Sequence, residues 1–234
     1  MLIPSQSWGE DIAIDSSLVR RNLDEIKKNI AHYNVKIIAV TKYFGLKAMI
    51  AGYEAGIRDF AESRALEAIE KLSSLPDDIR KNSTFHFIGH LQSNKAEKVV
   101  ENFDVIHSVD SVKIAKVISK AACALNKREK ILLQVNNAGE KQKSGFSKEE
   151  LIESFKEISA LGGIEILGLM NMAPLGAGED ELTRLFGDIK KFRDELESRF
   201  GAKLPELSMG MSDDYPIAVK EGATIIRIGR KLFN

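Results

Sequence analysis

The feature that most constrains the fold of this chain is a regular alternation between short apolar runs and amphipathic stretches. Strands of a parallel sheet that are buried on both faces read as near-continuous apolar runs, and helices link them. Eight such units in 234 residues predict an α/β protein, a single (β/α)₈ barrel. An open doubly wound sheet would be expected to carry G-x-G-x-x-G after its first strand, and that motif does not follow the first run. The eight runs are 35–41, 58–61, 84–89, 105–109, 130–135, 164–170, 206–209 and 224–229.

An amphipathic helix is predicted at the start of the chain. Val19, Leu23, Ile26 and Ile30 recur at helical spacing after Asp15, a favoured N-cap residue. The last apolar run ends only a few residues before the end of the sequence, so we expect no eighth helix after it. The opening helix is therefore expected to complete the outer ring of helices.

The connecting stretches carry further helix signals. Residues 147–150 and 94–97 each read as a capping box, in which a polar N-cap is followed three residues later by glutamate. We find no linker rich in Gly, Pro or Ser and no tight repeat. Residues 1–234 are therefore expected to form one domain.

Composition narrows the class of partner. Lys plus Arg equals Asp plus Glu at 34 each, without a basic stripe, so a small molecule is favoured over nucleic acid or a membrane. The single cysteine, Cys123, excludes an intramolecular disulfide and indicates a reducing compartment; we expect it to pack on a helix. Glu10 and Asp11 charge the first residues, and no long apolar run follows, so we expect neither a secretory signal nor a transmembrane span. The expected location is cytoplasmic.

The stretch 207–230, LSMGMSDDYPIAVKEGATIIRIGR, contains two features suited to an anion. Gly210 allows close backbone approach, and Ser212 can open a helix whose first N–H groups carry a partial positive charge. Gly229 is a second position where the backbone can come close to an anion, and the Arg230 side chain places a cation beside it. The functional interpretation is a phosphate site; the plainer one is a strand, helix and strand of scaffold.

A (β/α)₈ barrel brings together residues at the carboxyl ends of its strands, and phosphate often binds after strands 7 and 8. On the local sequence alone, Lys42 after the first apolar run is better interpreted as the first solvated residue of a loop. The functional interpretation is a partly desolvated amine at this rim. Arg227 interrupts the last strand and could point into the same site. Together with methionines, which suit a flat ring, these residues suggest a phosphorylated aldehyde held as an imine. The other polar and methionine residues expected at the rim are Glu62, Ser63, His90, Gln92, Asn94, Ser108, Asp110, Asn136, Met170, Asn171, Met172, Ser208 and Met211.

The histidines do not predict a metal site. His86 and His90 are four residues apart, which on a strand separates them by roughly 13 Å. We expect His90 to contact a ligand at the rim. His86, between Phe85 and Phe87, is expected to be structural.

Several runs are long enough to compare with known families. They are AVTK (39–42), HFIGHLQSNK (86–95), IHSVDS (106–111), QVN (134–136), KSGF (143–146), GLMNMAP (168–174), SMGMSDDYPIAVKEGAT (208–224) and RIG (227–229). These runs resemble the pyridoxal phosphate homeostasis proteins (the YggS/PROSC family). The resemblance implies a barrel like the N-terminal domain of alanine racemase, with pyridoxal 5′-phosphate (PLP) bound as a Schiff base. By position it implies that Lys42 carries the imine, that Arg227 faces the pyridine nitrogen, and that Ser212, Gly229 and residue 230 contact the phosphate.

Several positions depart from the family pattern. Ala61 stands where glycine is usual, Tyr43–Gly45 replaces a short polar run with proline, and Phe233 and Asn234 lack the closing glycine. Ser63 stands where asparagine is usual, and Arg230 stands where a small hydroxyl residue is usual. A guanidinium beside the phosphate would add a charge-assisted contact worth on the order of 1.5–3 kcal/mol.

The sequence therefore predicts a PLP-binding protein that holds the cofactor on Lys42 and takes part in PLP homeostasis. It would deliver PLP to apoenzymes that need it, as a monomer and without turnover of its own. The alternative is a small PLP-dependent amino-acid racemase; apart from the resemblance, a Schiff-base aldolase is a third hypothesis. Racemisation is disfavoured because Arg227 would not protonate the pyridine nitrogen as a carboxylic acid would, and because the chain ends straight after its last strand. Tyr43 and Tyr215 are the only local tyrosines that could serve as proton donors.

Overall fold

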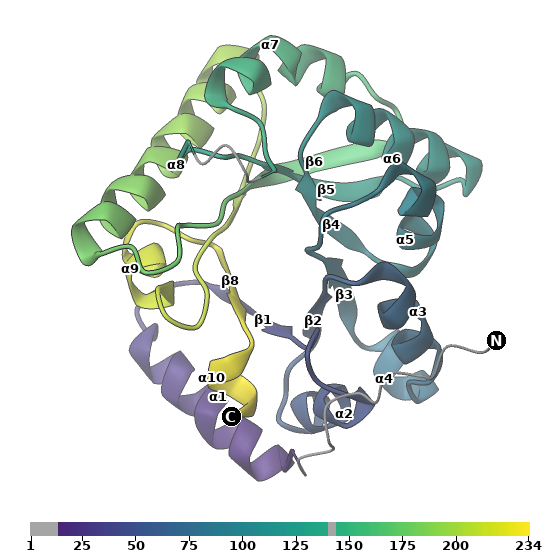
Figure 1. Cartoon of the computed structure of the whole chain (residues 1–234), viewed down its shortest axis with the longest axis vertical. Helices are drawn as coiled ribbons and strands as arrows, with labels where there is room; N and C mark the ends of the chain where they lie inside the picture. Colours follow the sequence, from purple (N-terminus) through teal and green to yellow (C-terminus); the bar gives the residue numbers. More distant parts are fainter. Residues whose placement is uncertain (1–13, 140–143) are drawn as a thin grey trace, which may run out of the picture.

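The strands form a closed barrel. The structure, a computed structural model, describes residues 14–139 and 144–234. All eight strands are parallel, each pairs with its neighbour in sequence, and β8 closes the ring against β1 (Figure 1). The predicted (β/α)₈ barrel and its eight strands are confirmed, with boundaries within two residues of those expected. The strands are β1 (Lys36–Val40), β2 (Asp59–Glu62), β3 (Thr84–Phe87), β4 (Val105–Val109), β5 (Glu129–Gln134), β6 (Ile164–Met170), β7 (Glu206–Ser208) and β8 (Ile225–Ile228).

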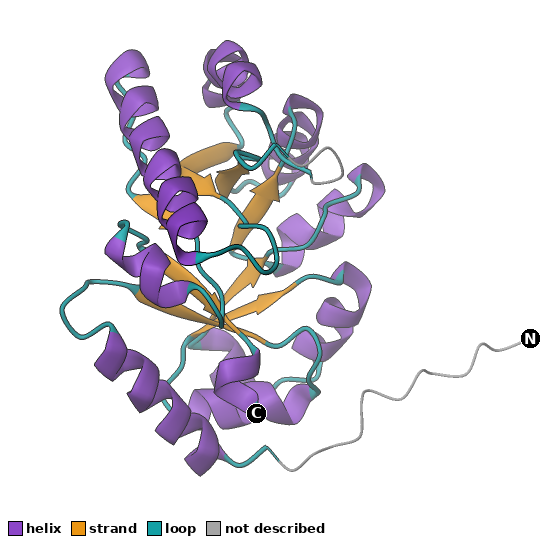
Figure 2. Ribbon diagram, turned by 60° about the vertical axis from the view of Figure 1, so that its left-hand side comes forward, coloured by secondary structure: helices purple, strands orange, loops and turns teal. Residues whose placement is uncertain are grey.

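Helices surround the barrel on the outside, as Figure 2 shows from a second direction. A large apolar cluster fills the layer between strands and helices, which is why the helices are amphipathic. The helices are α1 (Ser16–Asn29), α2 (Leu46–Glu54), α3 (Ala65–Ser73), α4 (Asp77–Lys81), the 3₁₀ turn η1 (Ser93–Lys95), α5 (Ala96–Asn102), α6 (Val112–Ala124), α7 (Lys148–Ser159), α8 (Glu179–Phe200), α9 (Tyr215–Lys220) and α10 (Arg230–Phe233).

Helix α1 completes the outer ring next to β8, as expected. Its N-cap is Asp15, whose side chain accepts a hydrogen bond from the backbone N–H of Ser17. It packs against α2 and α10 (Figure 1). Asn22 Nδ2 on α1 donates to the Leu232 carbonyl at 3.0 Å. The expectation that no helix follows the last strand was wrong, because α10 forms one turn there and buries Phe233 against the Phe44 ring.

The two predicted capping boxes have different outcomes. The box at Ser147 and Glu150 is confirmed, since both reciprocal hydrogen bonds are present. The box at residues 94–97 was wrong, because a 3₁₀ turn precedes α5 and Lys95 occupies its N-cap position without a side-chain bond.

The helix expected to open at Ser212 begins later. Its N-cap is Asp214, and its first residue is Tyr215. The Asp214 carboxylate accepts a hydrogen bond from the backbone N–H of Met211, which holds residues 211–214 as a turn before α9.

The interior of the barrel is partly polar. Small apolar clusters around Ile38 and Leu132 occupy part of it. His107 on β4 bonds Ser208 on β7, and because these strands are not neighbours, that contact crosses the interior. Arg227 is also buried there. Barrel interiors are usually filled by branched apolar side chains, so these polar groups need an explanation.

Two findings bear on the expectations from composition. Cys123 is exposed on α6 and does not pack as expected. Among the described residues, no helix is long and apolar enough to cross a membrane.

Candidate functional site

A cavity of about 660 Å³ lies at the carboxyl ends of the strands. This is the end of the barrel at which ligands bind in proteins of this fold. Its wall comes from the ends of β1, β3, β6 and β8, from the loop after β6 and from the turn after β7. The lining residues are Val40, Lys42, Tyr43, Phe44, Ile88, Met170, Met172, Ala173, Pro174, Leu175, Gly176, Ala177, Leu182, Met211, Ser212, Asp213, Asp214, Arg227, Gly229 and Arg230.

Lys42 enters this cavity from a tight turn that follows β1. The Thr41 N–H still bonds the Ala61 carbonyl on β2 at 3.0 Å, and the Phe44 N–H bonds the Thr41 carbonyl at 2.9 Å. The Lys42 ammonium lies 5.0 Å from the centre of the Tyr43 ring, which is mostly exposed at the rim. The turn therefore presents the amine at the mouth of the barrel beside an aromatic face.

A buried ion pair between Lys71 and Glu62 stabilises the turn that carries Lys42. Lys71 on α3 donates to the Phe44 carbonyl at 2.7 Å, to the Thr41 carbonyl at 3.0 Å and to Glu62 Oε1 at 2.7 Å. The Thr41 hydroxyl donates to the same carboxylate oxygen at 2.7 Å. Because Lys71 bonds the carbonyls on both sides of Lys42, it orients the segment that carries the amine. The sequence did not suggest a role for Lys71, which lies on a helix far from the rim signals.

Arg227 forms the buried wall of the cavity. Its Nη1 donates to the carbonyl and the hydroxyl of Ser208, both at 2.7 Å, and its Nη2 donates to the Asn171 carbonyl at 2.9 Å. Burial lowers the pKa of the guanidinium to about 10, against a smaller opposing effect of Asp214. Arg227 therefore stays cationic at neutral pH, in a fixed position.

The turn after β7 and the start of α10 form the other side of the cavity. Gly229 is the N-cap of α10, and a Cβ there would lie 3.2 Å from the Val40 carbonyl oxygen, so this position favours glycine. Ser212 is half-buried, and the backbone N–H of Lys231 approaches its hydroxyl at 3.4 Å. Hydroxyl and helix N–H groups at one place suit an anionic oxygen group.

The Arg230 side chain is engaged elsewhere. It donates to Asp213 at 2.5 Å, and both side chains are about two-thirds or more exposed. The strong phosphate contact expected of this guanidinium would require that surface pair to open.

Of the candidates at the rim, Met172 lines the cavity, but Glu62, Gln92, Asn94, Ser108, Asp110 and Asn171 do not. Four residues expected to bind the cofactor also lie outside its lining. Ser63 packs its backbone against Gly89. His90 is mostly exposed, with Nδ1 at 3.2 Å from Asp110. Asn136 is tied by its backbone N–H to the Phe146 carbonyl, and Ser208 is fully buried behind Arg227. Ser63, His90 and Asn136 follow strands as predicted, and Ser208 is the last residue of β7.

The other candidates include residues that line the cavity and residues that do not. Lys42, Met170, Met211, Ser212, Arg227, Gly229 and Arg230 do line the cavity. Tyr215 does not: it is buried, and its hydroxyl accepts a hydrogen bond from Asn29 on α1 at 2.9 Å. Lys143 lies outside the described residues.

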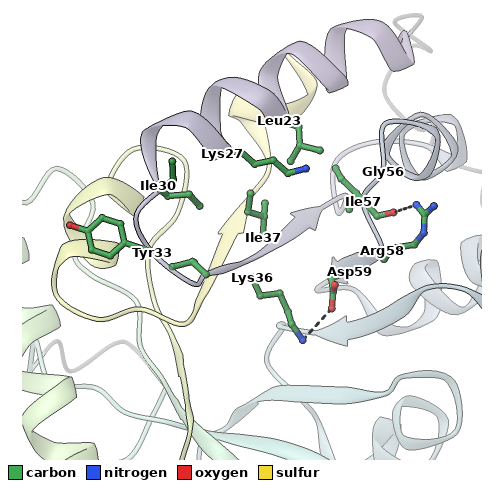
Figure 3. Close-up of a pocket in the computed structure, with 12 residues that line it drawn as sticks. Leu23, Lys27, Ile30, Tyr33, Lys36, Ile37, Gly56, Ile57, Arg58 and Asp59 are labelled. Carbon is green, nitrogen blue, oxygen red and sulfur yellow. Dashed lines mark hydrogen bonds and ion pairs between the residues drawn. The ribbon is translucent and has the colours of Figure 1, made fainter.

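A second hollow, of about 400 Å³, lies at the opposite end of the barrel (Figure 3). It is an open groove between α1 and the amino ends of β1 and β2. Lys36 and Asp59 meet there, with the ammonium 3.6 Å from the carboxylate (Figure 3). Within the described part of the chain, no cluster of three or more His, Cys, Asp or Glu is arranged to hold a metal ion.

Comparison with known proteins identifies the family. The family described as alanine racemase, N-terminal domain, matches residues 14–234. The pyridoxal phosphate homeostasis protein of Synechocystis sp. is 44% identical over 200 residues, which cover 86% of this chain and 91% of that protein. The chain belongs to the pyridoxal phosphate homeostasis protein family. The resemblance seen in the sequence is thereby confirmed.

Comparison with solved structures agrees with this family assignment. PipY of Synechococcus elongatus, determined with PLP bound, is 40% identical, with a TM-score of 0.85 over 92% of this chain and 100% of that chain. An alanine racemase of Clostridium difficile 630 is 19% identical, with a TM-score of 0.74 over 94% of this chain and 56% of that one. At that identity the racemase shares the fold alone.

Proposed function

We propose that this chain binds PLP in the cavity at the carboxyl ends of its strands, held covalently by Lys42, and that it takes part in PLP homeostasis. The observation that carries the proposal is the meeting of Lys42, the buried Arg227 and the Ser212–Gly229 edge around one cavity. The family relatives named for PLP homeostasis, and the PipY structure with PLP, support the choice of ligand.

The residues present fit such a cofactor. A volume of about 660 Å³ is in the range of small-molecule sites. The cavity offers an amine, a fixed cation and a polar edge with close backbone approach, and Met170 and Val40 supply apolar surface for a ring. Both carboxylates at its edge already have hydrogen-bond donors: Arg230 donates to Asp213, and the Met211 N–H donates to Asp214. These bonds reduce the electrostatic repulsion between the carboxylates and a bound anion.

Each residue has a role that follows from its chemistry. When bound, PLP supplies an aldehyde that condenses with a primary amine, with loss of water. Lys42 provides that amine. Ser212 and the backbone at Gly229 would hold the phosphate, and Met170 and Met211 would bound the ring. Arg227 remains protonated, so it could donate a hydrogen bond to the ring nitrogen, but with a pKa of about 10 it is too weak an acid to protonate that nitrogen at neutral pH.

We further propose a carrier that stores and delivers PLP in the cytoplasm as a monomer, without catalytic turnover. Racemisation needs proton-transfer groups on both faces of the substrate α-carbon. Tyr215, one of the two tyrosines considered for this, has its hydroxyl bonded to Asn29 and is buried away from the cavity. Tyr43 remains at the rim and is the residue to test.

The test compares exchange with delivery. Holoprotein is incubated with L-alanine and other amino acids in deuterated water, and α-proton exchange is followed by NMR. We expect no exchange above that with free PLP, and we expect the same holoprotein to restore activity to an apoenzyme that requires PLP. Rapid exchange that Lys42→Ala abolishes and Lys47→Ala leaves intact would make the protein a racemase, and loss of that exchange in Tyr43→Phe would identify the proton donor.

A further inference from the structure

Five polar side chains form a continuous hydrogen-bonded series through the barrel. It starts at Arg227, whose Nη1 lies 2.7 Å from Ser208 Oγ. Ser208 Oγ lies 2.9 Å from His107 Nδ1, and His107 Nε2 lies 2.9 Å from His86 Nδ1. His86 Nε2 lies 3.0 Å from Asp59 Oδ1, in the groove at the far end of the barrel that Figure 3 shows. The series therefore joins the proposed PLP cavity to the opposite end of the molecule.

The chemistry of the groups gives this series a direction. A guanidinium can only donate, so Ser208 Oγ accepts from Arg227 and can donate its own hydrogen to His107 Nδ1. His107 then carries its proton on Nε2 and donates to His86 Nδ1. His86 carries its proton on Nε2 and donates to the Asp59 carboxylate, which can only accept. Every member donates toward Asp59 without a conflict.

The reverse arrangement is unfavourable. If His107 donated to Ser208 and His86 donated to His107, a neutral His86 would turn its Nε2 lone pair toward the Asp59 carboxylate. The alternative is a doubly protonated His86, a buried cation that the charge of Lys36 would oppose. His86 and His107 are almost fully buried, and their rings meet edge to face at 82° with centres 5.1 Å apart. An added charge there would be costly.

The charged groups that surround the histidines agree with neutral rings. Burial lowers the pKa of His86, with Asp59 and Asp104 opposing that effect and Lys36 adding to it. Burial also holds the pKa of His107 well below its usual value, and His86, Arg227 and Lys36 act in the same direction. For Asp59, burial acts to raise the pKa, but the bond from His86 and the charge of Lys36 leave it lower than usual.

The buried charge of Arg227 has a carboxylate nearby, that of Asp214, but is not hydrogen-bonded to it. Within the described residues its guanidinium donates to two carbonyl oxygens and one hydroxyl, and to no carboxylate. A buried charge without a paired ion is destabilised unless dipoles compensate for it. Aligned hydrogen bonds polarise one another, and here all of them point from the cation toward the anion.

We propose that His86, His107 and Ser208 are positioning residues for Arg227, forming a one-way hydrogen-bonded chain that links its charge to the Asp59 carboxylate. The inference rests on the proposed function, because Arg227 is taken to face the cofactor ring. The chain would fix the guanidinium against the ring and couple cofactor retention to a carboxylate outside the cavity.

The first test does not need the cofactor. Ring-nitrogen NMR of the apoprotein reports which nitrogen of each histidine carries a proton. The chain has four histidines, so the variants His32→Gln and His90→Gln leave His86 and His107 to be read directly. We expect both rings to be neutral at neutral pH, with the proton on Nε2. A proton on Nδ1 of either ring, or a doubly protonated His86, would overturn the proposal.

The second test measures coupling in the holoprotein. Asp59→Asn keeps the acceptor oxygen but removes the charge, and Ser208→Ala removes the hydroxyl link. Each is expected to speed PLP release to a scavenging apoenzyme by about fivefold or more, and Ser208→Thr is expected to restore retention. Asp77→Asn is the matched control, since it removes an exposed carboxylate on α4.

The outcomes separate the two proposals. Unchanged release from both variants, with wild-type PLP binding intact, would refute the positioning role. If the wild-type protein does not bind PLP, the proposed function fails, and the NMR measurement still decides the direction of the chain.

Discussion

Removing Lys71 is expected to destabilise the protein and loosen the turn that presents Lys42. In Lys71→Met the Glu62 carboxylate would stay buried, since its side chain is 4% exposed, with only the Thr41 hydroxyl as a partner among the bonds described. Breaking a buried pair by removing one partner costs about 3–5 kcal/mol. The carbonyls of Thr41 and Phe44 would each lose the hydrogen bond from Lys71, although the Thr41 carbonyl would keep the one from the Phe44 N–H. The expected total is at the upper part of that range.

Urea unfolding followed by circular dichroism measures this cost. The double variant Glu62→Gln/Lys71→Met removes the unpaired charge as well and should be more stable than Lys71→Met by at least about 1 kcal/mol. Lys81→Met is the control, because its pair with Asp77 is exposed and should contribute less than about 1 kcal/mol. A cost below about 1 kcal/mol for Lys71→Met, with no faster loss of PLP, would refute the reasoning.

Three further changes have defined outcomes. Burial raises the pKa of Glu129 to about 7, above its usual 4.5, so the folded state binds this proton more tightly than the unfolded state does. The free energy of unfolding should therefore fall by up to about 3 kcal/mol as pH rises from 4.5 to 7. Urea titrations at both pH values should show that Glu129→Gln removes this dependence of stability on pH. An unchanged dependence would mean that other groups cause it. Arg230→Ala should weaken PLP retention by less than about 1 kcal/mol at low salt, because the side chain is exposed and paired with Asp213; a larger loss in a dialysis assay would mean that it binds the phosphate directly. Gly210→Ala should lower the stability measured by thermal unfolding more than Gly176→Ala. Both glycines have positive φ, where alanine is strained by on the order of 1–3 kcal/mol. A Cβ at 210 would also lie 2.6 Å from the methyl carbon of Ala218 on α9, whereas one at 176 would meet nothing within 4 Å. Equal costs would contradict the proposed crowding.

The strands could be predicted because their physics is local. A parallel strand buried on both faces is a short apolar run, and runs such as 37–40 (IIAV) have this form. The barrel then brings the residues after its strands to one end, so the meeting of Lys42, Arg227 and Ser212 could be anticipated from their places in the order of elements.

The contacts that support these residues could not be predicted in this way. His86 and His107 meet because β3 pairs with β4 in a register that sets His86 opposite Val105, and a sequence does not reveal register. Lys71 lies on a helix, where a lysine is normally solvated, and only the packing of α3 carries it beneath the turn at residues 41–44. The direction of the Tyr215 hydroxyl likewise depends on α1, which is distant in the chain.

The central claim is that Lys42 holds PLP, and mass spectrometry of the native and borohydride-reduced protein tests it most directly. Reduction makes an imine permanent, so the added mass of the pyridoxyl phosphate should appear on the tryptic peptide of residues 37–47, with cleavage blocked at Lys42. The Lys42→Ala variant should take up no such mass. The same mass on Lys47, Lys95 or Lys143, or its persistence in Lys42→Ala, would contradict the assignment.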